Sequence, residues 1–429
     1  MEEIMMLWIG AIIVILAFVA VIKQWEVRAT LFGAGLLMCI LSGHPLTAFD
    51  SFSKMLVSSW LVPIIACAMG FAQVITLTEC DKHFSFLALK HVLKFKAMLI
   101  PATVVVTWVL AMAMNSPAGL AATIGPIIIP VLIRAGISPA MAGATLLVAT
   151  WGGCASVSSP HIALITSFSH SDIADVVIRT LPAAGVVLLI CAFGMYATAL
   201  FLKENKGYEI PGESATDLME EVKEFKVNYL KALMPLLPLI LLILGAKQVG
   251  LIYRFSVPQV MMIGMILTLL VSWTSPFEAM RRFCKGMGDG FGNIVSIIAA
   301  AAVFTAGMKD IGLIDALLNA MKDSVDIAKI AGSWGPFLIA ALSGSGDAAT
   351  LAFNNAVTPN ASQLGMDIDL LGMTAYYGGS LGRTISPVAG VCIILAGVAK
   401  VNPLQLSKRV MATCIVGNVA ALTVLQYML

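Results

Sequence analysis

Long apolar runs separated by short polar segments fill most of this chain. Many of the runs are about 20 residues long, the length that an α-helix needs to cross a bilayer. Two of them are interrupted by Gly, Ser and Pro and are expected to be broken helices. The expected spans are 5–22, 28–43, 59–78, 139–169 (broken), 176–202, 231–247, 257–274, 290–307, 368–397 (broken) and 408–428. The pattern predicts an all-α polytopic membrane protein with about 10 transmembrane helices.

Two more apolar regions, 97–134 and 328–360, are interrupted near their middle. The interruptions are Asn115-Ser116-Pro117 and Ser343-Gly344-Ser345-Gly346-Asp347. Because lipid cannot satisfy free backbone N–H and C=O groups, such breaks persist only inside protein or beside a wet cavity. We therefore expect two re-entrant hairpins. Three segments of mixed polarity are expected to be interfacial helices: 80–95, 277–288 and 311–326.

The two interrupted regions belong to a repeat. Three pairs of residues share one separation along the chain: Ser116 and Ser345, Pro130 and Pro359, and Gly136 and Gly365. An aromatic-Gly-Gly sequence followed by Ser-Pro also occurs twice, at 151–160 and 377–387. Matching helix breaks in two hydrophobic halves are typical of inverted-repeat secondary transporters and indicate the substrate site.

One polar stretch, 203–229, divides the chain into repeats at 1–202 and 230–429. With the N-terminus outside, most of the 26 lysines and arginines fall on the cytoplasmic side, as the positive-inside rule requires. Both termini are then periplasmic or extracellular, and the polar linker is cytoplasmic. Each half has an odd number of spans, so the first hairpin enters from the cytoplasm and the second from outside.

The composition supports the membrane assignment. The 429 residues are 59% hydrophobic and 12% charged, whereas soluble domains carry about 25% charged residues. The eight cysteines are scattered without metal-ligand spacing, and no His, Cys and Asp cluster has catalytic spacing. We therefore expect no enzyme and no resident cofactor or metal. The expected partners are the bilayer and a small solute, not nucleic acid.

The hairpin tips and broken spans supply the candidate site residues. Helix N-termini there offer free N–H donors and partial positive charge, which suit a carboxylate. The expected substrate-binding residues are Asn115, Ser116, Pro117, Ser343, Ser345, Gly346, Asp347, Arg383, Thr384 and Ser386. The expected coupling-ion or proton site, where transient Na⁺ would meet hydroxyls and unwound carbonyls, comprises Ser156, Ser158, Ser159, His161, Asp347, Gly379 and Ser380.

Arg383 is the most informative single residue, because a guanidinium within a span costs at least ~2.5–3.5 kcal/mol and indicates function. Its planar fork matches a carboxylate, which favours direct substrate binding. The alternative is a structural ion pair with Asp347, which is also a candidate for binding a proton or Na⁺. His161 either faces the site or packs as a neutral histidine, and Asp289 and Asn293 are weaker candidates.

At these residues the chain resembles the anaerobic dicarboxylate carrier family of type C (DcuC), within the ion transporter superfamily. The stretches that carry the likeness are 116–120, 286–293, 344–346, the Gly-Arg-Thr-Ile-Ser-Pro-Val-Ala-Gly run at 382–390, 396–400 and 408–409. The likeness extends over essentially the full chain. It implies a homodimer in which a fixed scaffold domain holds a moving transport domain that carries the hairpins and broken helices in elevator fashion.

The resemblance implies secondary active transport of four-carbon dicarboxylates across the bacterial inner membrane. Fumarate, succinate and malate are the expected substrates, with aspartate as a further candidate, moved by uptake, exchange or efflux coupled to H⁺ or Na⁺. Two departures from the family pattern stand out: Asp347 replaces an amide, and Asn115-Ser116-Pro117 replaces Ser-Ser-Ala. The alternatives are a carrier of another carboxylate or amino acid, or a cation/proton antiporter, for which a nearby guanidinium such as Arg383 is unsuited.

Overall fold

The structure is a computed structural model that describes residues 2–23, 25–92, 98–114, 116–208, 225–246, 249–316 and 325–428. Every regular element in these residues is helical. The first half contains α1 (Glu2–Ile22), α2 (Val27–Leu41), α3 (Pro45–Leu56), α4 (Leu61–Leu77), α5 (Cys80–Val92), α6 (Leu99–Ala113), α7 (Pro117–Arg134), α8 (Pro139–Leu147), η2 (Gly152–Ala155), α9 (Pro160–Ser169) and α10 (Ile173–Phe201). The second half contains α12 (Tyr229–Leu233), η3 (Met234–Leu236), α13 (Leu237–Gly245), α14 (Val257–Ser272), α15 (Pro276–Gly290), η4 (Phe291–Val295), α16 (Ser296–Asp310), α18 (Val325–Ser343), α19 (Gly346–Ala356), η5 (Thr358–Leu364), α20 (Ile368–Ile385), α21 (Gly390–Ala399), α22 (Pro403–Thr423) and η6 (Val424–Met428).

The prediction of an all-α polytopic membrane protein is confirmed. In the described residues, seven helical stretches are long and apolar enough to cross a membrane, or eight if the bent pair of α3 and α4 is one span. The expectation of about 10 spans exceeds this number because several apolar runs fold into shorter helices. These shorter apolar helices are Val27–Leu41, Leu99–Ala113, Tyr229–Gly245 and Val257–Ser272.

The helix breaks lie where the sequence predicts them. The region 97–134 folds as α6 and α7, and the region 328–360 as α18, α19 and part of η5. Ser116 and Ser345 each cap the returning helix, since each hydroxyl oxygen accepts a hydrogen bond from the amide three residues later, at 3.1 and 3.2 Å. Gly136 and Gly365 both adopt positive φ, 92° and 67°, which glycine allows without strain. Paired residues of the repeat therefore have the same local structural role.

One helix in the first half was not expected from the sequence. α3 begins at Pro45, and its axis makes an angle of 50° with that of α4. Phe49 and Phe52 both pack edge-on against Phe32 of α2, with ring centroids 6.3 and 5.5 Å from that of Phe32. This aromatic contact with a neighbouring helix stabilises a segment whose own polarity resembles that of a loop.

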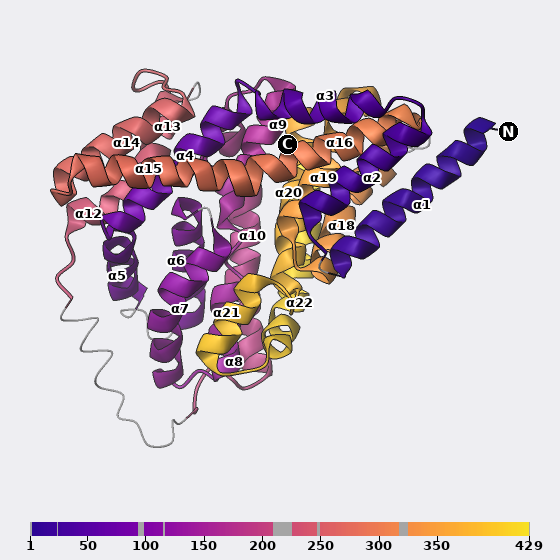
Figure 1. Ribbon diagram of the computed structural model, residues 1–429. Helices are drawn as coiled ribbons and strands as arrows, with labels where there is room; N and C mark the ends of the chain where they lie inside the picture. Colours follow the sequence, from indigo (N-terminus) through magenta and orange to yellow (C-terminus); the bar gives the residue numbers. More distant parts are fainter. Residues whose placement is uncertain are drawn as a thin grey trace.

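The second correction concerns segment 277–288, which was expected to be a separate interfacial helix. It is instead continuous with α16 through the π-helical turn η4, and the combined helix Pro276–Asp310 has 35 residues (Figure 1). α15 packs closely on α4: a Cβ at Gly286 would lie 2.4 Å from the Met69 carbonyl oxygen. α15 thus buries Ala279, Phe283, Gly286 and Gly290, whereas Phe277 and Met280 are exposed.

Three further predicted segments lie partly outside the described residues. The parts outside are 93–95 of the segment 80–95, 317–324 of the segment 311–326, and 209–224 of the linker 203–229.

Tight helix packing places the second hairpin against the second broken span. A Cβ at Gly378 would lie 2.2 Å from the Ser333 carbonyl oxygen, and one at Gly382 would lie 2.1 Å from that of Phe337. Contacts this short leave room only for glycine, so α20 and α18 approach backbone to backbone. In the first half, Gly152 makes the same kind of approach, 2.4 Å from the Trp108 carbonyl oxygen.

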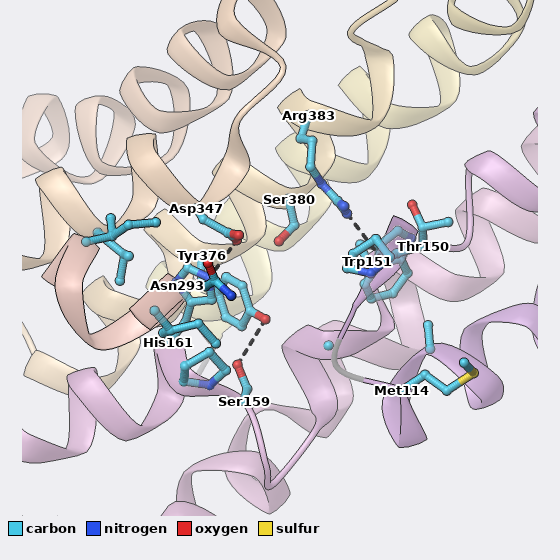
Figure 2. A pocket seen from close by; sticks show the side chains of 17 residues that line it. Met114, Thr150, Trp151, Ser159, His161, Asn293, Asp347, Tyr376, Ser380 and Arg383 are labelled. Atoms are coloured by element: carbon cyan, nitrogen blue, oxygen red, sulfur yellow. Dashed lines mark hydrogen bonds and ion pairs between the residues drawn. The ribbon is translucent and has the colours of Figure 1, made fainter. Parts of the chain in front are cut away.

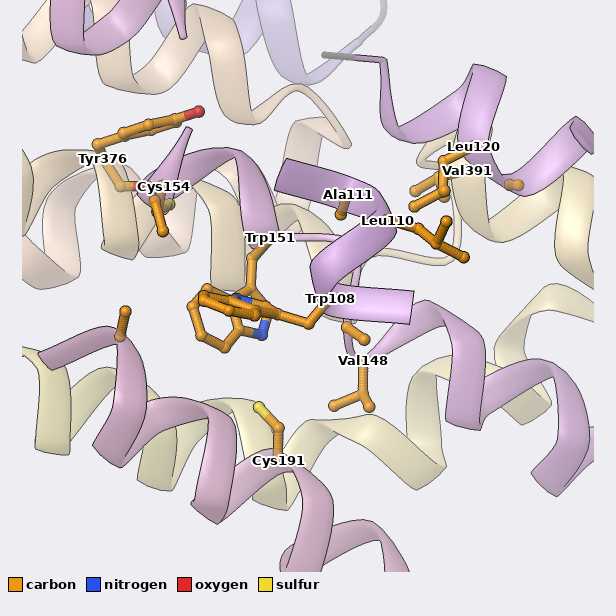
Figure 3. Close-up of a cluster of buried hydrophobic side chains, with 14 of the residues drawn as sticks. Trp108, Leu110, Ala111, Leu120, Val148, Trp151, Cys154, Cys191, Tyr376 and Val391 are labelled. Carbon is orange, nitrogen blue, oxygen red and sulfur yellow. Dashed lines mark hydrogen bonds between the residues drawn. The ribbon is translucent and has the colours of Figure 1, made fainter. Parts of the chain in front are cut away.

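The main hydrophobic core lies around the first break. Trp151 of the break is buried, with its ring 5.6 Å from Trp108 and 5.9 Å from Tyr377. Figure 3 shows these indoles beside Val148 and Cys191. Three elements that are distant in sequence, α6, the break and α20, are thus fixed relative to one another beside the candidate site.

Candidate functional site

A cavity of about 90 Å³ lies where the hairpins and broken spans meet (Figure 2). Its walls come from both halves of the chain: α6, the first tip, the first break and α9 on one side, and η4, α16, α19 and α20 on the other. The lining residues are Ala111, Met114, Pro117, Thr150, Trp151, Gly153, Ser159, Pro160, His161, Asn293, Ile294, Ile297, Asp347, Leu351, Tyr376, Ser380 and Arg383.

A hydrogen-bonded group of polar side chains around Asp347 forms one side of the cavity. His161 Nε2 lies 2.9 Å from Asp347 Oδ1, and the imidazole stacks on Tyr376 with ring centroids 4.3 Å apart. The Tyr376 hydroxyl accepts a hydrogen bond of 3.0 Å from Ser159 Oγ. The Asp347 side chain is 73% exposed, whereas that of His161 is 5% exposed. The carboxylate therefore faces the cavity and the imidazole supports it from behind.

The basic side of the cavity is formed by Arg383, in the last turn of α20. Its Nη2 donates to the Thr150 carbonyl oxygen at 3.3 Å, a group exposed by the break between α8 and η2. In the described residues, the guanidinium makes this one hydrogen bond. Its other N–H groups are therefore available to a ligand. Figure 2 shows Arg383 and Asp347 on different sides of the cavity with Ser380 between them.

The second tip is held in place by backbone contacts. Gly344 has a φ of 75°, and a Cβ there would lie 2.9 Å from the amide nitrogen of Ala389, so the turn requires glycine. A Cβ at Gly346 would lie 3.2 Å from Arg383 Cβ. This close approach fixes the start of α19, and with it Asp347, relative to Arg383.

A second cavity of about 370 Å³ lies beside the first tip. It contains Ser116, Ser156 and Ser158, and it shares Met114 with the first cavity. Ser156 and Ser158 are hydrogen-bonded to each other at 2.9 Å. Asp81 of α5 also lines it, and burial raises the pKa of this carboxyl above its usual range.

The DcuC family, described as C4-dicarboxylate anaerobic carrier, matches residues 44–428. The chain belongs to the DcuC family. The DcuC anaerobic C4-dicarboxylate transporter of Escherichia coli strain K12 is 26% identical over 98% of this chain and 96% of its own length. A probable DcuC of Vibrio cholerae is also 26% identical, over 97% and 96%.

A further relative is more similar over a shorter stretch. A putative uncharacterized transporter of Haemophilus influenzae is 38% identical over 59% of this chain and 93% of its own length. The expected resemblance to DcuC carriers is confirmed, and the family consists of transporters rather than enzymes. In the described part of this DcuC chain, no group of three His, Cys, Asp or Glu side chains is placed to hold a metal ion.

The structure brings only part of the predicted set to the first cavity of this DcuC chain. Pro117, Ser159, His161, Asp347, Ser380 and Arg383 line it. Ser116, Ser156 and Ser158 line the second cavity instead. The remaining predicted residues, Ser343, Ser345, Gly346, Gly379, Thr384 and Ser386, shape or support the tip and α20, and Asn115 lies outside the described residues.

Thr384 and Ser386 were expected to bind substrate but are fully buried away from the cavity lining. Thr384 donates to the Ser380 carbonyl oxygen of its own helix at 2.8 Å. A helix presents neighbouring residues to different faces, so Arg383 and Thr384 cannot share one direction. Gly379 is buried for a different reason, since a Cβ there would lie 2.1 Å from Thr350 Oγ1.

The sequence did not predict Tyr376, Thr150 or Trp151 as site residues, although Trp151 opens the repeated aromatic-Gly-Gly sequence. Tyr376 stands four residues before Ser380 and seven before Arg383, so it shares their helix face. That spacing was a usable signal. Thr150 contributes a backbone carbonyl, which no residue type encodes. Asn293, a weaker candidate, lines the cavity from the π-helical turn, a feature often found at functional sites.

Proposed function

We propose that this protein is a secondary active carrier of C4 dicarboxylates in the bacterial inner membrane. The observation that carries the proposal is a guanidinium, Arg383, with free N–H donors at a cavity enclosed by apolar helices. A guanidinium inside a membrane protein raises the free energy of the folded state unless it pairs with an anion or another polar partner, so its presence indicates a functional site. The DcuC family, and relatives named as C4-dicarboxylate transporters, support the choice of ligand.

We propose that the halves 1–202 and 230–429 form an inverted repeat joined by a cytoplasmic linker at 203–229, with both termini outside. Three equivalences support this. Ser116 and Ser345 both cap a helix. Gly136 and Gly365 both adopt a left-handed backbone conformation. The packing of α15 on α4 has its counterpart in the packing of α3 on α16. The hairpins and broken spans would then move together as a transport domain against a scaffold that holds α2–α4 and α14–α16.

The substrates that fit the proposal are fumarate, succinate and malate, moved by uptake, exchange or efflux. Coupling to H⁺ or Na⁺ would use the hydroxyl and carboxylate groups near the first break, among them Ser156, Ser158 and Asp347. A homodimer is proposed from the resemblance to the superfamily alone.

Purified protein in liposomes tests the proposal. Vesicles loaded with unlabelled succinate should accumulate external labelled succinate by counterflow, which needs no imposed gradient. A pH or Na⁺ gradient should then show which ion increases uptake into empty vesicles. Absence of counterflow for succinate, fumarate, malate and aspartate alike would refute the carrier assignment.

A further inference from the structure

The charged groups of the first cavity are balanced. Among its described lining residues, Arg383 supplies one positive charge and Asp347 one negative charge, and the titratable neighbours are His161 and Tyr376. A dicarboxylate carries two negative charges, and only one of its carboxylates can pair with Arg383. The other would share the small cavity with the carboxylate of Asp347, at a Coulombic cost.

The imidazole of His161 does not relieve this conflict. Its Nδ1 is buried without a hydrogen-bond partner in the described chain, while Nε2 faces Asp347. A protonated ring would carry an N–H donor at both nitrogens, and the one at Nδ1 would be buried without an acceptor. The geometry therefore favours the neutral ring with Nε2–H donating to an ionised Asp347.

The Asp347 carboxylate can accept further hydrogen bonds. An ionised carboxylate accepts about four hydrogen bonds, and His161 uses one oxygen from the buried side. The Asp347 side chain as a whole is 73% exposed and lines the cavity. A ligand that contacts Arg383 and Asp347 together must present an acceptor to the first and a donor to the second.

We propose that this cavity selects a carboxylate that also carries an ammonium group, with Arg383 binding the carboxylate and Asp347 the ammonium. The inference rests on the proposed function and narrows the substrate class to amino-substituted dicarboxylates. Asp347 is then the specificity-determining residue, and His161 a positioning residue that holds its carboxylate toward the cavity. An ammonium group paired with Asp347 lowers the net negative charge of the loaded cavity from two, with a plain dicarboxylate, to one.

The test compares two ligands that differ by one ammonium group, succinate and aspartate. Binding of each to the purified full chain is measured by isothermal titration calorimetry at pH 8. Aspartate should bind about tenfold more tightly than succinate, the ratio expected for a charge-assisted hydrogen bond. Asp347→Asn should remove that preference by weakening aspartate and strengthening succinate. Asp50→Asn, an exposed carboxylate on α3, is the matched control and should leave both affinities unchanged.

The outcomes separate the two proposals. Succinate binding as tightly as aspartate to the wild-type chain would overturn this inference and leave the carrier assignment intact. So would a preference for aspartate that persists in a folded Asp347→Asn protein. Binding of neither ligand, together with no binding of fumarate or malate, would overturn the proposed function itself. The wild-type comparison decides the question even if the variant does not fold.

Discussion

The two hairpin tips share a backbone design but differ in the chemistry that they bring to the cavity. Ser116 and Ser345 cap the returning helices with nearly equal hydrogen bonds, 3.1 and 3.2 Å. Two residues after the cap, the first tip has Ala118, whereas the second has Asp347 at the cavity. The two tips therefore share a local fold, whereas the second tip alone brings a charged side chain to the cavity.

The broken spans differ in the same way. In the second half, α20 stays helical to Ile385 and supplies Arg383 from its last turn. In the first half, α8 ends at Leu147, and the unwound chain exposes the Thr150 carbonyl that accepts from Arg383. The second half supplies the cation, Arg383, and the first half supplies the Thr150 carbonyl that orients it. The site therefore depends on both halves, although Arg383 and Asp347 both belong to the second.

The largest expected effect comes from Arg383→Lys. Lysine keeps the charge but loses the planar fork, so it cannot bind Thr150 and a carboxylate in the same geometry. Transport in liposomes should fall by about ten- to hundredfold, the equivalent of a charge-assisted hydrogen bond. Thermal unfolding should change little, because the ammonium remains beside the cavity.

Arg179→Lys is the matched control for this prediction. Arg179 pairs with Asp367 at 2.8 Å, and both side chains are 39% exposed. Exposed pairs contribute about 0–1 kcal/mol, so transport should stay within about twofold of wild type. Equal losses in both variants, or unfolding of the Arg383 variant, would assign Arg383 to a structural role.

The glycines of the two broken spans should have similar effects on stability in the two halves. Gly152 and Gly378 occupy matching positions, and a Cβ would lie 2.4 and 2.2 Å from the carbonyl oxygens of Trp108 and Ser333. Replacement of either by alanine should destabilise the protein by about 1–3 kcal/mol, since neither backbone can retreat easily. Thermal unfolding of the purified variants measures this.

Gly397→Ala controls for the change of residue type. Gly397 lies in α21, and a Cβ there would have no neighbour within 4 Å. This variant should match wild type or gain up to about 1 kcal/mol from better helix propensity. A loss in only one of the two close-packed variants would show that the halves are not packed alike.

The sequence predicts the fold better than the site. The positions of the helix breaks follow from Gly, Ser and Pro in apolar runs, and the structure has them at Ser116, Ser345 and both broken spans. The helix α3 and the joined α15–α16 were missed because their stability depends on contacts with other helices, which local polarity does not report.

Site residues were predictable where their chemistry is unusual for a membrane span. Asp347, His161 and Arg383 stand out for this reason, and the structure places all three at the cavity. Thr384 and Ser386 lie away from the first cavity, because residues next to each other in the sequence point to different faces of α20 or follow its last residue. The pairing of Asp347 with His161 rather than Arg383 depends on the spatial meeting of α9 and α19, which no spacing encodes.

The smallest expected effects come from removing the two capping serines, Ser116 and Ser345. Ser116→Ala and Ser345→Ala each remove one capping hydrogen bond and should each cost about 1 kcal/mol of stability. Substrate affinity should respond unequally. Loss of the second cap loosens the turn that carries Asp347, so aspartate binding should weaken roughly fivefold, the equivalent of about 1 kcal/mol. Ser116 faces the second cavity, so its variant should bind within about twofold of wild type. Equal weakening in both variants would mean that the two tips contribute alike to the site, and that the chemical difference between them is not used in binding.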